Sequence, residues 1–152
     1  MREMRRKDRQ LDQKEAERIL SEGEYGILST VGRDDVPYGV PVSYAYRDGV
    51  IYFHGTRGTS RKADNIAHQP KVCFTVVGNT EVLPEKFSTR YESVIVFGTA
   101  LAARDKTLGL RLLQEKYSPG FKEQGQEYIN ASLDQVAVYE ILVDDMTAKG
   151  RR

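Results

Sequence analysis

The residues best suited to chemistry form one short run, from Gly55 to Lys62, which reads Gly-Thr-Arg-Gly-Thr-Ser-Arg-Lys. Its glycines let a ligand come close to the backbone, and its hydroxyl and basic side chains can donate hydrogen bonds to an anion. Ser60 is a typical N-cap for a helix beginning at Arg61, and the N–H groups at a helix start attract negative charge. The run fits a phosphate site, and it also fits a polar loop before a capped, solvated helix. It lacks the Gly-x-x-x-x-Gly-Lys-Ser/Thr order of a P-loop.

His54 stands immediately before this run, at the end of an apolar segment. An imidazole with an ordinary pKa of about 6.5 can give a hydrogen bond or a proton to a substrate. The alternative is a histidine at a strand end that is bonded to a backbone carbonyl. A metal site is not expected, because the two histidines and the one cysteine, at positions 54, 68 and 73, match no zinc spacing.

The composition predicts a soluble chain that forms a single domain over residues 1–152. A net charge of only +1 argues against nucleic acid as a partner. No apolar run approaches the ~18–20 residues that a membrane span needs. The lone Cys73, together with the lack of a recognisable signal peptide, predicts a cytoplasmic location. The charged segment 1–10 is expected to be a flexible basic arm.

Periodicity and turn signals predict a mainly antiparallel fold. Strands are expected at residues 25–31, 37–46, 50–54, 71–77, 91–103 and 135–146, with an irregular loop at 78–90. Helices are expected at residues 13–21, 61–68, 106–116 and 121–130. Asp12 and Glu15 have the spacing of a capping box for the first helix, and Asp105 is expected to cap the third.

Two further features restrict the sheet. Pro37 and Pro41 cannot donate ladder hydrogen bonds, so their strand is expected at an open edge or a bulge, and Gly98 is expected to bend a long strand. The sum is an α+β fold, a mainly antiparallel six-stranded barrel or half-open barrel with peripheral helices. No strand leads into a Gly-x-Gly-x-x-Gly turn, so a Rossmann unit is not supported.

Three motifs resemble the FMN-binding split-barrel superfamily of pyridoxamine 5'-phosphate oxidase: Phe53-His54-Gly55, Ser60-Arg61-Lys62-Ala63 and Pro70-Lys71-Val72. The resemblance covers most of the chain and implies a split β-barrel that binds FMN noncovalently. It implies that the FMN phosphate is held by Ser60, Arg61 and Lys62, with Thr56 or Thr59. It also implies that the flavin ring lies along Val40, Pro41, Val42 and Ser43, and that Ser93 is supplied by a second subunit.

Within that superfamily the chain is most similar to the nitroimidazole-resistance (Nim) family. The motifs are Arg5-Arg6-Lys7-Asp8, Pro37-Tyr38-Gly39-Val40-Pro41 and Ser93-Val94-Ile95-Val96-Phe97-Gly98. This similarity implies a homodimer with the cofactor at the interface, His54 close to the flavin, and electron transfer from NAD(P)H through FMN to a small acceptor such as a nitroaromatic. The C-terminal segment has no histidine, unlike that of the oxidases, so oxidation of pyridoxamine phosphate itself is not expected.

The sequence leaves other functions open. The same fold serves noncatalytic flavin- or haem-binding sensors, and it accepts the deazaflavin F420 in place of FMN in F420-dependent reductases. A nucleic-acid-binding barrel that uses the basic arm is disfavoured by the near-neutral charge.

Overall fold

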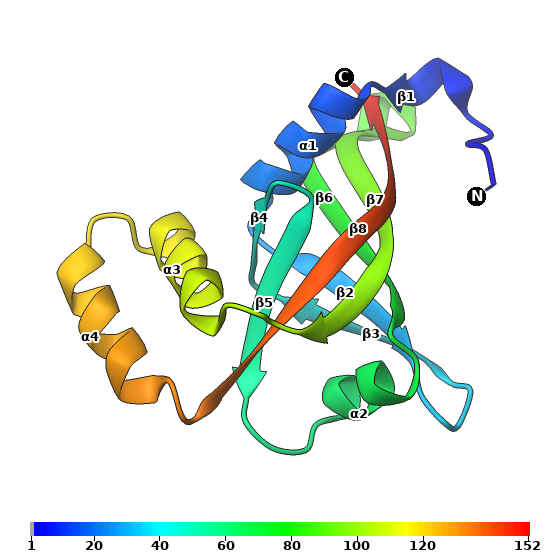
Figure 1. Cartoon of the computed structure of the whole chain (residues 1–152). Coiled ribbons are helices and arrows are strands. Elements are labelled where there is room, and N and C mark those ends of the chain that lie inside the picture. The colour runs from blue at the N-terminus through cyan, green and yellow to red at the C-terminus, as the bar shows by residue number, and fades with distance from the viewer. Residues whose placement is uncertain (1) are drawn as a thin grey trace.

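The computed structural model describes residues 2–152, so the predicted arm at residues 1–10 begins one residue outside the described part. Within this part a rolled sheet carries α1 at one end and α2 at the other, while α3 and α4 stand beside β5 (Figure 1). The strands are β1 (Gln10–Leu11), β2 (Gly26–Val31), β3 (Pro37–Val42), β4 (Tyr44–Arg47), β5 (Val50–Thr56), β6 (Lys71–Leu83), β7 (Ser88–Ala102) and β8 (Val136–Arg151). The α-helices are α1 (Gln13–Glu22), α2 (Arg61–His68), α3 (Lys106–Tyr117) and α4 (Lys122–Ser132), and short 3-10 turns are η1 (Lys7–Arg9) and η2 (Pro84–Lys86).

The strands of residues 2–152 form one eight-stranded antiparallel sheet. Its order is β3-β2-β6-β7-β8-β5-β4, and β1 pairs with β8. The two outer strands, β3 and β4, follow each other with only Ser43 between them, so the sheet rolls up on itself. The predicted α+β antiparallel barrel is confirmed. The count of six strands is wrong, because the expected strand 37–46 breaks at Ser43 and because residues 10–11 form β1.

The core fills the interior of the rolled sheet. Tyr44, Phe53 and Phe74 are fully buried there, and the rings of Tyr44 and Phe74 meet edge to face with centroids 4.9 Å apart. Helix α1 closes one end with the apolar stripe of Ala16, Ile19 and Leu20, and the Tyr44 hydroxyl donates to the Leu20 carbonyl at 2.5 Å. Because its hydroxyl is hydrogen-bonded, this tyrosine can be buried without leaving an unsatisfied polar group.

Local helix signals are well reproduced. The side chains of Asp12, Ser60 and Asp105 each accept a hydrogen bond from a backbone N–H in the first turn of α1, α2 and α3. The capping box at α1 is only half formed, since the Glu15 carboxylate pairs with Arg18 and Arg152 instead of reaching back. An ion pair with two guanidinium groups replaces the expected second bond of the box.

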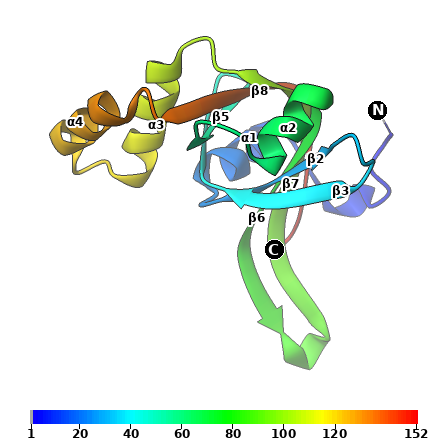
Figure 2. The same cartoon turned by 90° about the horizontal axis from the view of Figure 1, so that it is seen from below.

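The segment expected to be an irregular loop, residues 78–90, is a hairpin arm. β6 continues to Leu83, β7 begins at Ser88, and the arm projects away from the barrel (Figure 2). The register of the β6–β7 pair shifts between Gly78 and Glu81, and η2 closes the tip. The prediction was wrong because Gly78 and Pro84, which are usual loop signals, mark a bulge and a turn here.

Both predicted irregularities of the sheet are confirmed. Among the described residues β3 pairs only with β2, so Pro37 and Pro41 lie on an edge strand. The register of the β7–β8 pair shifts between Phe97 and Gly98, and a Cβ on Gly98 would lie 2.5 Å from the Leu142 carbonyl oxygen. That close backbone approach explains why a glycine stands at the bend.

The N-terminal segment is partly structured, since η1 precedes β1, and the residues of β1, Gln10 and Leu11, pair with Lys149 and Ala148 of β8. No helix within residues 2–152 combines the length and the apolar character needed to cross a membrane.

Candidate functional site

The start of α2 carries the anion-binding features that the sequence predicts. The Ser60 side chain accepts from the Ala63 N–H at 3.2 Å, which fixes the first turn of an eight-residue helix. Gly58 adopts φ +116°, a conformation that favours glycine, and so lets the loop after β5 turn into the helix. The backbone N–H groups of such a first turn lack partners within their own helix and point toward an incoming anion.

Lys62 lies against the end of β5. Its ammonium is 6.0 Å from the centroid of the Phe53 ring. A Cβ built on Gly55 would be only 3.1 Å from that ammonium nitrogen, so the absence of a side chain at position 55 leaves the space that Lys62 occupies. The structure thus brings Lys62 to the strand that carries His54.

Arg61 points the other way, toward the β2–β3 turn. Its guanidinium donates to the Asp34 carboxylate at 2.9 Å and lies 5.2 Å from the centroid of the Tyr38 ring. Sequence reasoning missed Asp34 and Tyr38, because nothing in the local pattern links them to α2. The cations of Arg61 and Lys62 therefore stand on different sides of the helix start.

The other side chains of the run from Gly55 to Lys62 have different surroundings. Thr56 ends β5 opposite Val136, and both Thr56 and Thr59 are exposed. Arg57 is tied to the turn before β8, because its N–H donates to the Gln135 carbonyl at 2.8 Å and its guanidinium to the Asp134 carbonyl at 3.3 Å. The threonines remain available to a ligand at α2, whereas Arg57 holds the loop.

His54 and Ser43 line a groove beside the barrel. The groove has a volume of about 650 Å³ and runs between β5, the start of β8, α3 and α4. Its lining residues are Ser43, His54, Leu110, Leu113, Gln114, Tyr117, Ser118, Phe121, Gln124, Gly125, Tyr128, Ile129, Ser132 and Val136. His54 keeps exposed surface, but partial desolvation lowers its pKa and the nearby charge of Lys62 lowers it further, which favours the neutral imidazole.

Helix α3 clamps the chain just after Ser43. The Tyr44 N–H donates to the Tyr117 hydroxyl oxygen at 3.0 Å, and that hydroxyl donates to the Glu24 carbonyl at 2.6 Å. The Lys116 ammonium donates to the Tyr44 carbonyl at 2.9 Å and lies 3.8 Å from the Tyr44 ring centroid, and burial lowers its pKa to about 8. These contacts fix the bend between β3 and β4 from outside the sheet.

The residues predicted to follow the flavin ring lie on β3 and at its end. The side chain of Val42 is in the core, whereas Pro41 is exposed and Val40 half-buried. Ser93 is buried in β7 between Val77 and Lys149, at the base of the arm. The contribution of Ser93 through a second subunit stays a prediction.

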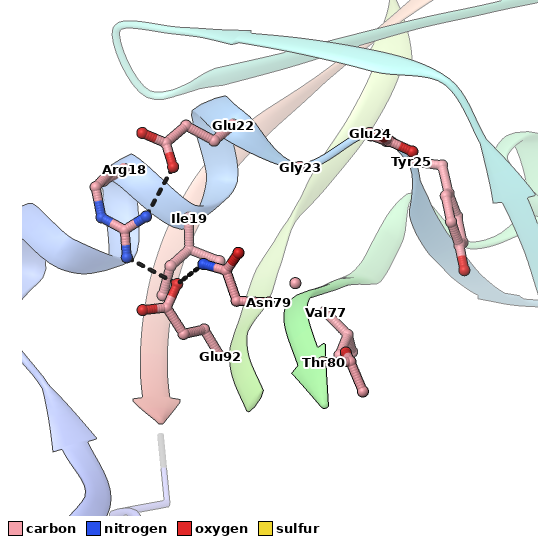
Figure 3. A pocket seen from close by; sticks show the side chains of 11 residues that line it. Arg18, Ile19, Glu22, Gly23, Glu24, Tyr25, Val77, Asn79, Thr80 and Glu92 are labelled. Atoms are coloured by element: carbon pink, nitrogen blue, oxygen red, sulfur yellow. Dashed lines mark hydrogen bonds and ion pairs between the residues drawn. The ribbon is translucent and has the colours of Figure 1, made fainter. Parts of the chain in front are cut away.

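A second polar cluster lies at the base of the arm and lines a hollow of about 390 Å³ (Figure 3). The Arg18 guanidinium donates to Glu15, Glu22 and Glu92 at 2.6–2.8 Å. Burial alone would raise the pKa of Glu92, but hydrogen bonds from Arg18 and Asn79 outweigh it and the pKa is lowered. Since its charges are paired with each other, this cluster serves to fix α1, β6 and β7 together.

In the described part of the chain, no group of three or more His, Cys, Asp or Glu side chains is arranged so that it could hold a metal ion. Polar groups are also accounted for, since no buried side-chain nitrogen or oxygen in residues 2–152 lacks a partner.

Comparisons with known proteins place these features in context. A sequence model described as pyridoxamine 5'-phosphate oxidase matches residues 12–150. No match was found among curated protein sequences. A proposed 5-nitroimidazole antibiotic resistance protein from Bacteroides thetaiotaomicron is similar in structure, with 21% identity, 93% of this chain and 86% of that chain covered, and a TM-score of 0.77.

Two other solved structures are similar over nearly the whole length of this chain. The flavocytochrome Anf3 from Azotobacter vinelandii has 21% identity, covers 99% of this chain and 72% of its own, and gives a TM-score of 0.82. An FAD and heme binding protein from Mycobacterium smegmatis has 19% identity and a TM-score of 0.79. The match covers 95% of this chain and 74% of that chain. At these identities the likeness establishes the shared fold.

Proposed function

The chain belongs to the pyridoxamine 5'-phosphate oxidase family, and from that premise we propose that it is an FMN-dependent oxidoreductase that passes electrons from NAD(P)H to a small acceptor. The observation that carries the proposal is the start of α2, where a capped first turn stands between the cations of Arg61 and Lys62, next to His54. FMN, when bound, supplies the electron-transfer chemistry, and the protein supplies grip, orientation and exclusion of water.

The donor set at α2 suits a phosphate. Arg61, Lys62 and the Ser60 hydroxyl are the candidates to hold it, with Thr56 or Thr59 beside them. The Arg61–Asp34 pair is about half exposed at both side chains, and such surface pairs contribute at most about 1 kcal/mol. A phosphate dianion can therefore recruit Arg61 at small cost.

The residues at the other end of the site suit a neutral, hydrogen-bonding ring. The exposed edge of β3 and Ser43 are the candidates to lie along the flavin, and His54 of β5 lines the same groove as Ser43. The lowered pKa favours the neutral His54 imidazole, and this form carries one ring proton and can donate one hydrogen bond without adding charge.

A homodimer is part of the proposal. The β6–β7 arm projects from the barrel with Phe87 96% exposed and Val82 69% exposed, and Val77 at its base is also exposed. A two-stranded hairpin is marginally stable on its own, and exposed apolar side chains mark surfaces that a partner covers. A second copy that packs on the arm would also bring Ser93, at the arm's base, toward the interface.

A haem-binding or sensor role is the second candidate. The specific observation is the groove itself, because it presents an imidazole, His54, on an otherwise largely apolar wall, and histidine is a common axial ligand of haem iron. Two structures of the same fold are described as a flavocytochrome and as an FAD and heme binding protein.

The test begins with the absorbance spectrum of the purified protein and the mass of whatever heat releases. We expect oxidised-flavin bands and released FMN; a Soret band would favour the haem candidate, and released F420 would replace FMN. Steady consumption of NADH or NADPH with an added acceptor then separates an enzyme from a sensor.

The phosphate assignment is tested by the double variant Arg61→Ala, Lys62→Ala. Each charge-assisted hydrogen bond contributes about 1.5–3 kcal/mol, so we expect FMN affinity to fall at least about a hundredfold. The matched control is Lys14→Ala, Arg111→Ala, which removes the same charge from exposed positions on α1 and α3. A double variant at α2 that purifies with as much FMN as this control would disprove the assignment.

A further inference from the structure

The groove between α3 and α4 is separate from the phosphate end of the site. None of Ser60, Arg61 or Lys62 is among the residues that line it, whereas Ser43 and His54 are. The groove therefore begins where the proposed flavin site ends and continues away from it, between two helices that no phosphate contact requires.

The walls of the groove are largely apolar, and the polar side chains among them are amides, hydroxyls and the His54 imidazole. Leu110, Leu113 and Ile129 are buried along it. The ring of Phe121, just before α4, is 61% exposed, and that of Tyr128, on α4, is 74% exposed. No aspartate, glutamate, lysine or arginine is among its lining residues. An uncharged ligand can enter such a site, whereas an ion would lose hydration with no opposite charge in return.

The volume sets the size of the ligand. A cavity of about 150 Å³ is enough to hold one benzene molecule, and this groove has about 650 Å³. Small-molecule sites of about 300–1,000 Å³ enclose ligands of drug size. A single five- or six-membered ring would leave most of the groove to water, whereas a molecule of two or more fused rings would reach the leucines and both aromatic rings.

The two helices that form the walls are held in place before any ligand arrives. A Cβ on Gly125 of α4 would come within 2.4 Å of the Gln114 side chain of α3, so the glycine allows close packing of the pair. The Tyr117 hydroxyl fixes the end of α3 to the chain beside Ser43. A preformed groove costs little ordering entropy on binding.

We propose that this groove binds an uncharged planar molecule of at least two fused rings, which serves as the electron acceptor next to Ser43 and His54. The assignment of the molecule as acceptor rests on the proposed function, whereas its binding in the groove does not. Leu110 and Leu113 form the floor, and Phe121 and Tyr128 stack along the rim.

Binding can be measured without any activity. The chain has no tryptophan, so Tyr128→Trp introduces a single indole at the rim of the groove. In this reporter protein we expect 1-nitronaphthalene to quench the fluorescence of the indole in a saturable way. 4-Nitro-1-naphthoate, which adds one carboxylate to the same ring system, should bind at least about tenfold more weakly, and 2-nitroimidazole should also bind at least about tenfold more weakly because it buries less surface.

Two substitutions, one at the residue before α4 and one at its last residue, are made in the reporter background to locate the site. Ser132→Phe fills the groove from a half-buried lining position, and Phe121→Ala removes a stacking ring. We expect the dissociation constant for 1-nitronaphthalene to rise at least about tenfold and about fivefold, respectively. The matched control is Phe97→Ala, which removes an exposed phenyl ring on β7 and should leave binding unchanged.

The flavin content of the same proteins separates the two proposals. Unchanged flavin content in Ser132→Phe and Phe121→Ala, together with weakened quenching of the indole, supports the acceptor groove. Loss of flavin in Ser132→Phe would instead place the cofactor in the groove and overturn the inference, as would equal binding of the naphthoate or no effect of Ser132→Phe. Saturable quenching in a protein that binds no flavin would refute the proposed function and leave the groove as a binding site.

Discussion

Tyr117→Phe removes a single hydroxyl that joins α3 to the bend between β3 and β4. In the structure that oxygen accepts from the Tyr44 N–H at 3.0 Å and donates to the Glu24 carbonyl at 2.6 Å. Tyr44 has no exposed surface, so the substitution removes the partner of an N–H that is buried in the structure. The Tyr44 carbonyl keeps the Lys116 ammonium as a donor at 2.9 Å, so the main loss is one buried backbone donor.

The expected loss of stability follows from the loss of a partner for this one buried donor. An unsatisfied buried donor costs about 1–3 kcal/mol. Taking about 2 kcal/mol, and about 2–4 °C per kcal/mol for a chain of this length, the melting temperature should fall by about 4–8 °C. The matched control is Tyr128→Phe on α4, whose side chain is 74% exposed and whose loss of a hydroxyl should change the free energy of unfolding by less than about 0.5 kcal/mol.

Urea denaturation of the parent protein, Tyr117→Phe and Tyr128→Phe measures the differences in the free energy of unfolding directly. The three proteins are compared at equal protein concentration and equal flavin content. The clamp also predicts faster flavin release from Tyr117→Phe, because the backbone beside Ser43 is no longer held. Identical urea midpoints for Tyr117→Phe and Tyr128→Phe would refute the reasoning, since they would show that the Tyr44 N–H finds another partner.

Two other predictions concern the charges around α2. Lys62→Met should raise the pKa of His54, followed by its ring-proton NMR shift, because one of the two causes that lower it is removed; an unchanged pKa would leave burial as the only cause. In the parent protein His54 contributes stability above its unfolded pKa of about 6.5, and this is lost as pH falls through the lowered folded pKa. Asp34→Asn frees Arg61 and should tighten FMN binding by up to about fivefold in calorimetry. Asp35→Asn is the matched control, since Asp35 has φ 56°, which asparagine tolerates; weaker binding by Asp34→Asn would show that Asp34 orients Arg61.

The sequence predicted those features whose cause is local. The caps Asp12, Ser60 and Asp105 are each followed by the helix they start, because capping depends on residues three positions apart. The edge position of Pro37 and Pro41 also follows from one residue's chemistry, the missing N–H. Such signals hold in almost any tertiary context.

Features that depend on pairing with distant parts of the chain could not be predicted from the local sequence. Gly78 and Pro84 indicated a loop, but pairing with β7 extends β6 through the glycine to the proline. Similarly, the valine and tyrosine alternation of residues 37–46 continues across Ser43, and only the rolling of the sheet shows that β3 and β4 pair with different neighbours. Sequence periodicity identifies a strand, whereas its breaks are set by the whole sheet.

The candidate site illustrates the same division within two adjacent residues. Arg61 and Lys62 are both basic, and their spacing alone suggests two equivalent contacts to one phosphate. Consecutive positions on a helix diverge by about 100°, so the fold gives each a different neighbour: Asp34, which is 27 positions away in the chain, and the end of β5. Lys62 therefore lowers the pKa of His54, whereas Arg61 is paired with the Asp34 carboxylate, which the proposed phosphate would have to share or displace. The two residues have different surroundings, and these differences come from contacts that a short motif does not contain.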